Sequence, residues 1–343
     1  MKSRTFYIAS CAPEGGIHSY VCEDNHIVET GFFPVANANY IAFSPDKQYL
    51  FVSIAANNAG GVASFKILPD DSLQKRGEVV APEMQACHLC CDPSGTHIFT
   101  ANYPLGRVAQ YPLHDGIVEP AELCIQHPGH GPRADRQQNA HAHFTILSPD
   151  QRYLCVVDLG VDAIFAYPLT PDGIDRANVK TSRIVPGGCG PRHLVFTQDG
   201  KRAYLLNELA STIVSLTYED GTFSQVQTIP MLPEPYKDFN GAAAIRISAD
   251  EHFLYASNRG YDSIVTYRIF DGGILGQADL TLCPGSFPRD FNFLPSCGKL
   301  AIGHEKSSHV YFYNYEPTSG RFTPDGNIIR DIPRPICITE RPL

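Results

Sequence analysis

The chain has 343 residues, of which 43% are apolar and 18% are charged, and its formal net charge is −9. This apolar content supports a substantial core and excludes intrinsic disorder. The negative net charge, without clusters of Lys or Arg, argues against nucleic-acid and membrane-surface partners.

The first predicted strand lies at the N-terminus, within residues 1–10 (MKSRTFYIAS). This segment lacks the long apolar core of a secretory signal, so we expect a cytoplasmic protein. No apolar run approaches the ~18 residues that a membrane helix needs. The 11 cysteines are odd in number and scattered along the chain, which favours a reducing compartment over a disulfide framework.

One unit then recurs along the chain, consisting of a strand, a turn of the type Ser-Pro-Asp and an aromatic-rich strand. The copies are IAFSPDKQYLFVS (41–53), HLCCDPSGTHIFTAN (88–102), HFTILSPDQRYLCVVD (143–158), HLVFTQDGKRAYLLNE (193–208), IRISADEHFLYASNR (245–259) and FNFLPSCGKLAIGHE (291–305). Successive turns are 48, 56, 49, 51 and 46 residues apart. A period of this length is typical of propeller blades.

Each unit continues with a strand of alternating polarity, such as GGVASFKIL (60–68) or SHVYFYNY (308–315). Alternation over six to eight residues, with Val, Ile, Tyr and Phe, indicates a half-buried antiparallel strand. Weaker fourth strands follow, such as GTFSQVQTIP (221–230). Four short strands in roughly 50 residues favour a propeller blade over a helical solenoid.

The two ends of the chain supply a seventh unit. TFYIASC (5–11) and GGIHSYVC (15–22) match the second and third strands of a blade, and PICITE (335–340) matches a first strand. Pairing these segments closes the ring and removes an exposed sheet edge. We therefore predict an all-β protein, a seven-bladed β-propeller closed by its N- and C-terminal strands in one blade, with a single domain over residues 1–343.

Polar residues cluster where first strands begin and second strands end, and an antiparallel meander brings these positions to one face of the ring. Those before first strands are His88, His141, His143, Arg192, His193, Arg289 and Asp290. Those after second strands are Asn102, Tyr103, Asp158, Asn207, Glu208, Asn258, Arg259, His304 and Glu305. Convergent polar groups at one end of a closed ring predict a ligand site. Any one of them could instead hold neighbouring blades together.

The longest gap between turns contains the polar loop QHPGHGPRADRQQNAHAH (126–143), and a loop of this length in a compact ring is often functional. We interpret His127 and His130 as solvated loop residues. His141 and His143 point the same way on a strand but have no evident third metal ligand. Cys87 and Cys90 form a CxxC without a second pair at zinc-finger spacing, so we interpret them as buried strand cysteines and expect no metal or cofactor.

These motifs resemble the propeller-type 6-phosphogluconolactonase family, which also includes carboxymuconate cyclases. The resemblance covers essentially the whole chain. Its matching stretches are GPRADRQQNAHAHFTILSPD (131–150), VVDLGVDAI (156–164), GPRHLVFTQDGKRAYLLNELAS (190–211), YASNRGYDSIVTYRI (255–269) and FPRDFN (287–292). GPRH…NEL together with SNRG…DSI is a specific combination, whereas SPD turns alone are common.

The resemblance implies a seven-bladed propeller with a metal-independent active site on the polar face. The catalytic cluster it suggests is His143, Arg192, Glu208 and Arg259. We expect further substrate contacts from His88, His141, His193, Asn207, Asn258 and Arg289. Ala244 departs from the family, which often carries an acidic residue just before the first strand of the fifth blade. The segment 102–106 reads NYPLG, where a NYGSG turn is usual.

These residue types suit the hydrolysis of a phosphorylated sugar δ-lactone by water. Glu208 or His143 could act as the general base, and Arg192 or Arg259 could stabilise the oxyanion. Arg289 and the remaining arginine could hold the anionic end of the substrate, because a planar guanidinium matches phosphate or carboxylate. The chain contains no GxSxG nucleophile elbow, which fits attack by water.

Two other interpretations stay open. The first is a carboxymuconate cyclase-like or other sugar-lactone enzyme with the same cleft, in which the arginines would bind carboxylates. The second is a non-catalytic propeller scaffold, which would carry exposed aromatic residues on a rim (Tyr103 and Tyr261 are candidates) and no buried Arg–Glu pairs. The expected partner is a small anionic lactone, not a nucleic acid or a membrane, and the oligomeric state is left open.

Overall fold

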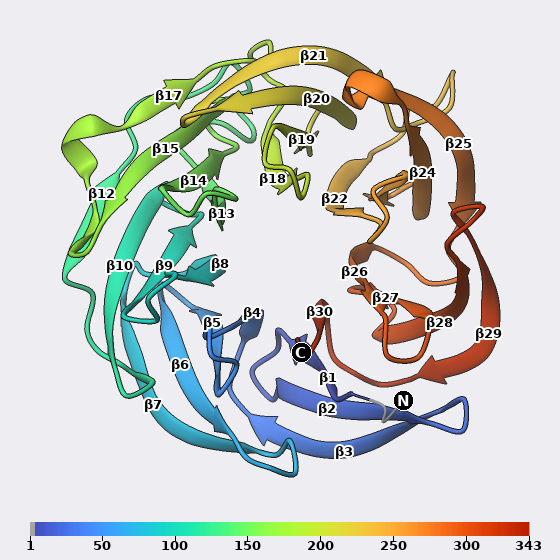
Figure 1. Ribbon diagram of the computed structural model, residues 1–343, viewed down its shortest axis with the longest axis horizontal. Coiled ribbons are helices and arrows are strands. Elements are labelled where there is room, and N and C mark those ends of the chain that lie inside the picture. Colours follow the sequence, from blue (N-terminus) through green and yellow to red (C-terminus); the bar gives the residue numbers. More distant parts are fainter. Residues whose placement is uncertain (1–3, 343) are drawn as a thin grey trace.

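Seven antiparallel sheets surround a central axis in the computed structural model, which describes residues 4–342 (Figure 1). This confirms the predicted seven-bladed propeller. Within the described residues, helical structure is limited to two short 3-10 turns, η1 (Arg176–Asn178) and η2 (Asp271–Gly273). No helix in that range is both long enough and apolar enough to cross a membrane.

Each blade runs outward from the axis through four main strands. The innermost strands are β4 (Ala38–Phe43), β8 (Ala86–Cys91), β13 (Ala142–Leu147), β18 (Pro191–Phe196), β22 (Gly241–Ile247), β26 (Pro288–Leu294) and β30 (Pro335–Glu340). The second strands are β5 (Tyr49–Ala56), β9 (His97–Asn102), β14 (Tyr153–Asp158), β19 (Arg202–Asn207), β23 (Phe253–Arg259), β27 (Lys299–His304) and β1 (Phe6–Ser10). In this order they define blades 1 to 7.

The outer half of each blade is more exposed. The third strands are β6 (Ala59–Ile67), β10 (Arg107–His114), β15 (Ala163–Thr170), β20 (Thr212–Glu219), β24 (Ser263–Ile269), β28 (His309–Glu316) and β2 (Gly16–Glu23). The outermost strands are β7 (Leu73–Pro82), β12 (Leu123–Gln126), β17 (Lys180–Ser182), β21 (Thr222–Pro230), β25 (Leu275–Leu282), β29 (Arg321–Ile329) and β3 (His26–Pro34). Two short strands, β11 (Ile117–Val118) and β16 (Gly173–Ile174), complete blades 2 and 3.

The hydrophobic core lies between neighbouring blades. Every residue of β14 (YLCVVD) and β23 (FLYASNR) is buried, because both faces of a second strand pack against adjacent sheets. Between blades 4 and 5, for example, Leu206 and Ile213 share a cluster with Leu254 and Val265. The outermost strands, such as β7, alternate between exposed and half-buried positions, which explains their weaker signal in the sequence.

The ring closes through the two ends of the chain. In blade 7 the strand order from the outside inward is β3, β2, β1, β30, with Phe6 opposite Glu340 and Ile8 opposite Ile338. The C-terminal strand is therefore the first strand of the blade, and the N-terminal segment supplies the second and third, as predicted. This pairing joins chain ends that are far apart in the sequence and leaves no open edge at the junction.

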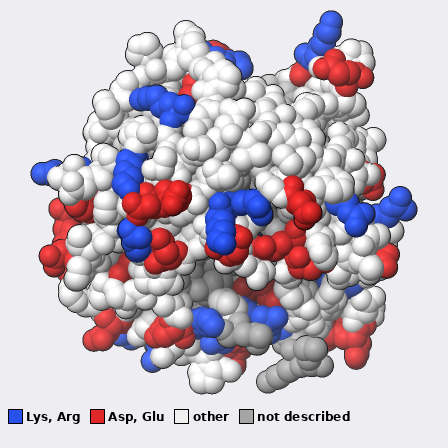
Figure 2. Space-filling model, turned by 45° about the horizontal axis from the view of Figure 1, so that its top comes forward, with Lys and Arg blue, Asp and Glu red and all other residues white. Residues whose placement is uncertain are grey.

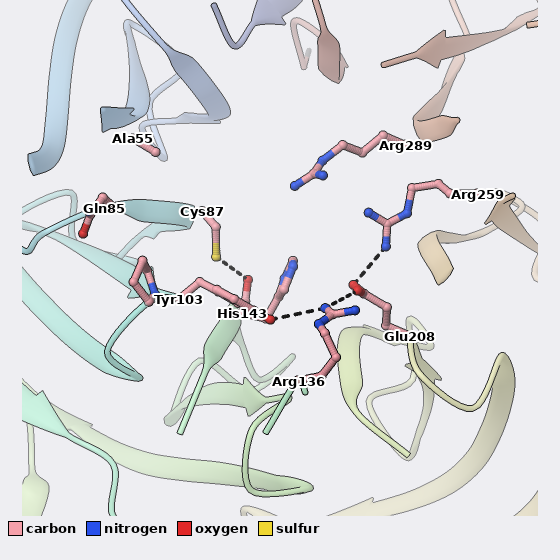
Figure 3. Close-up of a pocket in the computed structure, with 10 residues that line it drawn as sticks. Ala55, Gln85, Cys87, Tyr103, Arg136, His143, Glu208, Arg259 and Arg289 are labelled. Carbon is pink, nitrogen blue, oxygen red and sulfur yellow. Dashed lines mark hydrogen bonds and ion pairs between the residues drawn. The ribbon is translucent and has the colours of Figure 1, made fainter. Parts of the chain in front are cut away.

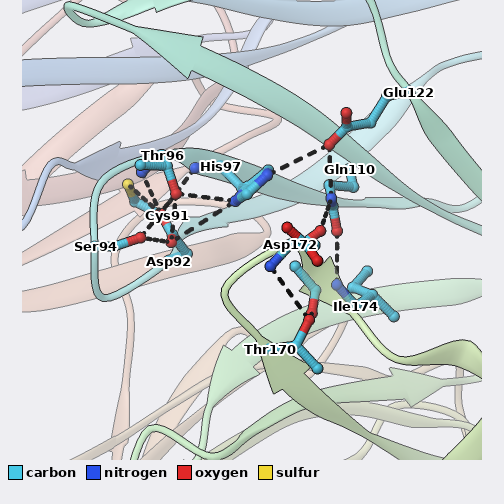
Figure 4. A network of polar contacts seen from close by, with 11 residues as sticks. Cys91, Asp92, Ser94, Thr96, His97, Gln110, Glu122, Thr170, Asp172 and Ile174 are labelled. Carbon is cyan, nitrogen blue, oxygen red and sulfur yellow. Dashed lines mark hydrogen bonds and ion pairs between the residues drawn. The ribbon is translucent and has the colours of Figure 1, made fainter.

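The turns between first and second strands lie on the face away from the predicted site and are stabilised by their own side chains. In blade 2 the Asp92 carboxylate accepts hydrogen bonds from the backbone N–H of Thr96 (2.7 Å) and of His97 (2.8 Å), and from the Ser94 hydroxyl (Figure 4). These bonds satisfy the backbone N–H groups of the tight turn within the turn itself. The Pro, Asp and Gly residues here therefore need no functional explanation.

Polar side chains also connect neighbouring blades. Gln110 Nε2 donates to Glu122 Oε1 (2.7 Å) within blade 2 and to the Asp172 carbonyl (3.0 Å) of blade 3 (Figure 4). The Gln110 side-chain oxygen accepts from the backbone N–H of Ile174 at 2.8 Å. Gln110 is 2% exposed, and its bonds to the Asp172 carbonyl and to the Ile174 N–H help to fix the spacing of the two blades.

Candidate active site

Repeated β-bulges at the start of the inner strands place side chains on the ring axis. The pairing with the second strand shifts register between Ala86 and His88, Ala142 and Phe144, Pro191 and His193, and Pro288 and Asp290. The residues left without a partner in the strand pairing are Cys87, His143, Arg192 and Arg289. A bulge re-aims the side chain that it leaves unpaired. The same local irregularity in blades 2, 3, 4 and 6 therefore builds much of the site.

A cavity of about 430 Å³ opens where inner strands begin and second strands end (Figure 3). Its size is that of a small-molecule pocket. The lining residues come from blades 1 to 6 and from the loop between blades 2 and 3, and are Ala55, Gln85, Cys87, Tyr103, Pro104, Arg136, His143, Glu208, Arg259 and Arg289. Residues more than a hundred positions apart thus converge on one face, as the sequence predicts.

Glu208 is the centre of an arginine cluster. Its Oε2 lies 3.0 Å from Arg192 Nε and 3.0 Å from Arg259 Nη2, and its Oε1 lies 2.7 Å from Arg136 Nη2. Burial alone would raise the pKa of the Glu208 carboxyl, but Arg259 and Arg192 outweigh burial and hold it well below its usual range. The carboxylate is therefore ionised, and both of its oxygens are engaged.

Backbone carbonyls of β22 hold two of these arginines in place. Arg259 donates from Nε to the Gly241 carbonyl (3.1 Å) and from Nη2 to the Ala242 carbonyl (3.2 Å). Arg192 Nη1 donates to the Ala243 carbonyl. Blade 5 thus acts on the site through its main chain, and the Ala244 side chain lies in the core between blades 5 and 6, not at the mouth.

His143 presents a neutral imidazole to the cavity. Burial, followed by the charge of Arg192, lowers its pKa well below the usual range. Its Nδ1 is buried and has no hydrogen-bond partner among residues 4–342. The ring packs edge-on to the rings of Tyr103 (centroids 5.6 Å apart) and His193 (5.5 Å). A neutral histidine with an unengaged nitrogen can accept a proton.

Arg289 brings a further positive charge from blade 6. Its Nη1 lies 3.0 Å from Glu305 Oε2, while Arg334 contacts the other oxygen of Glu305 at 2.8 Å. Burial would raise the pKa of the Glu305 carboxyl, but Arg289 and Arg334 lower it to about 2. In Figure 3 the guanidinium of Arg289 points into the cavity, where it can meet a ligand.

The charge around this cavity is positive although the chain as a whole is acidic. Four guanidinium groups (Arg136, Arg192, Arg259 and Arg289) lie there against two carboxylates, those of Glu208 and Glu305. On the outer surface shown in Figure 2, basic and acidic side chains are interspersed without a large area of one sign. The arrangement favours a small anion at the cavity over an extended polyanion.

Two of the predicted contact residues lie beneath the cavity. The His193 Nε2 is 2.8 Å from Arg192 Nη1, so this ring supports the arginine from below. His88 packs between the rings of Tyr40 and Phe144, and its Nδ1 lies 3.2 Å from Thr145 Oγ1. Neither ring lines the cavity, whereas Arg289, from the same set of predictions, does.

Three further predicted contact residues hold loops instead of lining the cavity. His141 stacks on the Tyr103 ring, and its Nδ1 lies 2.8 Å from the Tyr103 carbonyl oxygen. Asn207 Nδ2 donates to Thr212 Oγ1 (3.0 Å), and Asn258 Nδ2 donates to Ser263 Oγ (3.2 Å). They fix the ends of second strands, and a direct contact of any of them with substrate stays a prediction.

The loop 126–143 differs from expectation at one histidine. His130 is exposed, but His127 is 2% exposed, and its Nδ1 lies 2.7 Å from Asp158 Oδ2. The interpretation of His127 as a solvated residue is therefore wrong. A buried carboxylate at the end of β14 captures the ring and ties the loop to blade 3, an interaction between positions 31 apart that no local pattern reveals.

Arg136 and Cys87 line the cavity, although the sequence analysis did not name Arg136 and interpreted Cys87 as a buried strand cysteine. Arg136 belongs to the polar loop, but nothing in the spacing distinguishes it from Arg133, which pairs with Asp135 on the outside. Cys87 reaches the cavity because of the bulge, and burial raises the pKa of its thiol to about 12. The thiol is therefore protonated and is no candidate nucleophile.

Within residues 4–342, no three His, Cys, Asp or Glu side chains form a group suited to a metal ion.

The buried histidines predict loss of stability in acid. Burial, with nearby arginines, lowers the pKa of His88, His143 and His193 well below the usual value. Below about pH 6.5 the unfolded chain takes up protons that the folded state excludes, so stability falls as pH falls. We expect the free energy of unfolding to drop by at least about 2 kcal/mol between pH 7 and pH 5.

Urea unfolding at pH 7, 6 and 5 measures this change. His88→Phe, which suits a position between two aromatic rings, should reduce the slope, whereas substitution of the exposed His252 by Asn should leave it unchanged. A stability that stays constant from pH 7 to pH 5 would show that these rings are protonated in the folded protein.

Known proteins resemble this chain over nearly its full length. A family profile described as "Lactonase, 7-bladed beta-propeller" matches residues 5–340. The chain is 36% identical over 292 residues to an uncharacterised protein of Lactococcus lactis subsp. lactis (strain IL1403), covering 84% of each. It is 29% identical over 309 residues to the 6-phosphogluconolactonase of Bacillus subtilis (strain 168), covering 89% of this chain and 87% of that protein.

A solved structure agrees with these relatives. The fold matches the periplasmic gluconolactonase of Pseudomonas aeruginosa with a TM-score of 0.88 at 26% identity, covering 98% of this chain and 99% of that one. Together the similarities support the hydrolysis of sugar lactones as the class of reaction.

Proposed function

We propose that this chain, which belongs to the lactonase family of seven-bladed β-propellers, hydrolyses the ring ester of a phosphorylated sugar lactone. The observation that carries the proposal is a neutral His143, whose Nδ1 has no hydrogen-bond partner among residues 4–342, at a cavity with more arginines than carboxylates. Lactone hydrolysis needs a proton acceptor for water and cations for the negative charge that develops on the carbonyl oxygen. The cavity offers both.

His143 is the general base in this proposal. Glu208 is the poorer acceptor, because three arginines occupy its two oxygens and stabilise its ionised form. The imidazole takes a proton from water as the water oxygen bonds to the lactone carbonyl carbon. When the ring C–O bond breaks, the imidazolium returns the proton to the leaving oxygen, so that a hydroxy acid is released and His143 is neutral again.

Arg259 stabilises the oxyanion. Its Nε and Nη2 are held by β22 carbonyls and Glu208, which fixes the plane of the guanidinium before the reaction begins. A donor that is already oriented toward the developing charge contributes about 2.7–4 kcal/mol to the transition state. Arg192, 3% exposed, lies deeper and acts on the reaction by holding Glu208.

The anionic end of the substrate lies toward Arg289. This guanidinium uses Nη1 for Glu305 and faces the cavity with the rest of its planar fork. Two guanidiniums in excess of the carboxylates match a dianion such as a phosphate monoester. A carboxylated lactone is the second candidate, because the same arginines can bind carboxylates. The buried Arg–Glu pairs at the mouth argue against a non-catalytic scaffold.

A hydrolysis assay with three lactones tests the proposal. The purified protein should accelerate opening of 6-phosphoglucono-δ-lactone above the uncatalysed rate, and more than that of glucono-δ-lactone or a carboxylated muconolactone. Arg289→Met should raise KM for the phosphorylated lactone at least about 10-fold, since a charge-assisted hydrogen bond is lost. Preference for the muconolactone would favour the second candidate, and no acceleration of any lactone would refute lactonase activity.

A further inference from the structure

Arg136 is set apart from the other cavity arginines by its origin and its exposure. It comes from the loop between blades 2 and 3, whereas Arg192, Arg259 and Arg289 lie on strands. Its side chain is 32% exposed, against 4% for Arg192 and 9% for Arg259. Arg136 therefore lies on the open side of the cavity.

The guanidinium of Arg136 keeps donors that no protein group in the described part of the chain uses. Arg136 contacts Oε1 of Glu208, whereas Arg192 and Arg259 contact Oε2. Within residues 4–342 both side-chain hydrogen bonds of Arg136 use Nη2, which donates to Glu208 Oε1 (2.7 Å) and to the Tyr103 hydroxyl (3.3 Å). Nε and Nη1 are left to donate to a ligand, and the fixed Nη2 sets their direction.

The loop that carries Arg136 is held firmly. Gln137, which follows it, is 0% exposed, and its Nε2 donates to the Leu159 carbonyl (2.8 Å) and to Asp162 Oδ2 (2.9 Å). At the start of the loop, His127 is tied to Asp158. Buried anchors on both sides of Arg136 present its guanidinium at little entropic cost on binding.

From these observations we propose that Arg136, together with Arg289, binds the phosphate of the substrate and so selects phosphorylated over unphosphorylated lactones. This inference rests on the proposed function for its substrate class. With the lactone carbonyl between His143 and Arg259, the far end of a sugar chain points toward the open side, where Arg136 lies. An exposed and oriented guanidinium at that end, with Nε and Nη1 left to donate, meets the requirements of a phosphate contact.

Arg136→Met, which removes the charge but keeps an unbranched stem, tests the assignment. For 6-phosphoglucono-δ-lactone, kcat/KM should fall about 10- to 100-fold, mainly through KM, because a charge-assisted contact is lost. For glucono-δ-lactone, kcat/KM should change less than about threefold, since no phosphate is present to lose the contact. Arg136→Lys should be intermediate for the phosphorylated lactone. Arg133→Met is the matched control in the same loop, because Arg133 pairs with Asp135 away from the cavity.

The outcomes separate this role from a merely structural one. An equal loss for both lactones would mean that Arg136 only positions Glu208, and no loss for either would mean that it does not touch substrate. Both results overturn the inference. If the unaltered protein opens no lactone, the proposed function fails, and calorimetry with 6-phosphogluconate and gluconate then tests the inference alone. Phosphate-dependent binding that Arg136→Met abolishes supports it, and binding that is equal for both ligands or absent overturns it.

Discussion

Replacing His143 with Gln is expected to lower kcat for lactone hydrolysis about 10²- to 10⁴-fold, the contribution typical of a general base. Glutamine is similar in size and polar, but its amide does not accept a proton from water at neutral pH. KM should change far less, because the arginines that bind the substrate remain. Steady-state kinetics on the phosphorylated lactone, with melting temperature as a check on folding, measures the effect.

A matched variant in the neighbouring loop separates catalysis from disturbance of the loop. His130 is exposed, and within residues 4–342 its Nδ1 has a hydrogen bond only with the adjacent Gly131 carbonyl, so His130→Gln should keep the kcat of the unaltered protein. If His143→Gln retains kcat within about threefold, the imidazole is not the base. The same assay on Glu208→Gln would then decide whether the carboxylate takes the proton.

Lys299→Met is expected to lower the free energy of unfolding by about 3–5 kcal/mol, because it leaves the buried Asp325 carboxylate without its cationic partner. Lys299 is 2% exposed at the start of β27, and its Nζ lies 2.6 Å from Asp325 Oδ2 on β29. The same nitrogen donates to Asn25 Oδ1 (2.6 Å) in the β2–β3 hairpin of blade 7. The group therefore joins blade 6 to the blade that closes the ring.

Urea unfolding of Lys299→Met and of Lys75→Met distinguishes this buried pair from an ordinary surface pair. Lys75 contacts Glu78 at 2.5 Å, but its side chain is 47% exposed, so its loss should cost no more than about 1 kcal/mol. Lactone kinetics of Lys299→Met below its unfolding transition should be unchanged, because the pair is remote from the cavity lining. Equal effects of the two substitutions would mean that water reaches Asp325 in the folded protein.

The blade repeat could be recognised in the sequence because each pattern that indicates it is local. Alternation along β6 and β28, the SPD-type turns and their separation of about 50 residues all follow from neighbouring residues. The closing strand β30 was predictable for the same reason, because the segment PICITE matches the pattern of a first strand regardless of its position in the chain. The gathering of His143, Arg192, Glu208 and Arg259 at one face follows from the strand order of a meander.

The assignment of individual side chains was less predictable, because it depends on single-residue geometry. In blade 2 the bulge sends Cys87 to the cavity, and His88 packs between aromatic rings below it. In blade 3 the equivalent bulge directs His143 to the cavity, because His143 occupies the position equivalent to Cys87. Alternation along a strand cannot reveal where one residue is skipped, so His88 was predicted to contact substrate although its ring does not line the cavity.

The order of residues along the chain was thus enough to specify seven blades, the strand that joins the two ends and the face on which arginines and histidines gather, because periodic burial and turn chemistry are properties of short segments. The folded molecule alone decided that Arg136 enters the cavity while Arg133 stays outside, that His127 is buried, and that Glu208 is shared by three guanidiniums. These outcomes depend on contacts between blades and on how a long loop is anchored, which arise only when distant segments pack together.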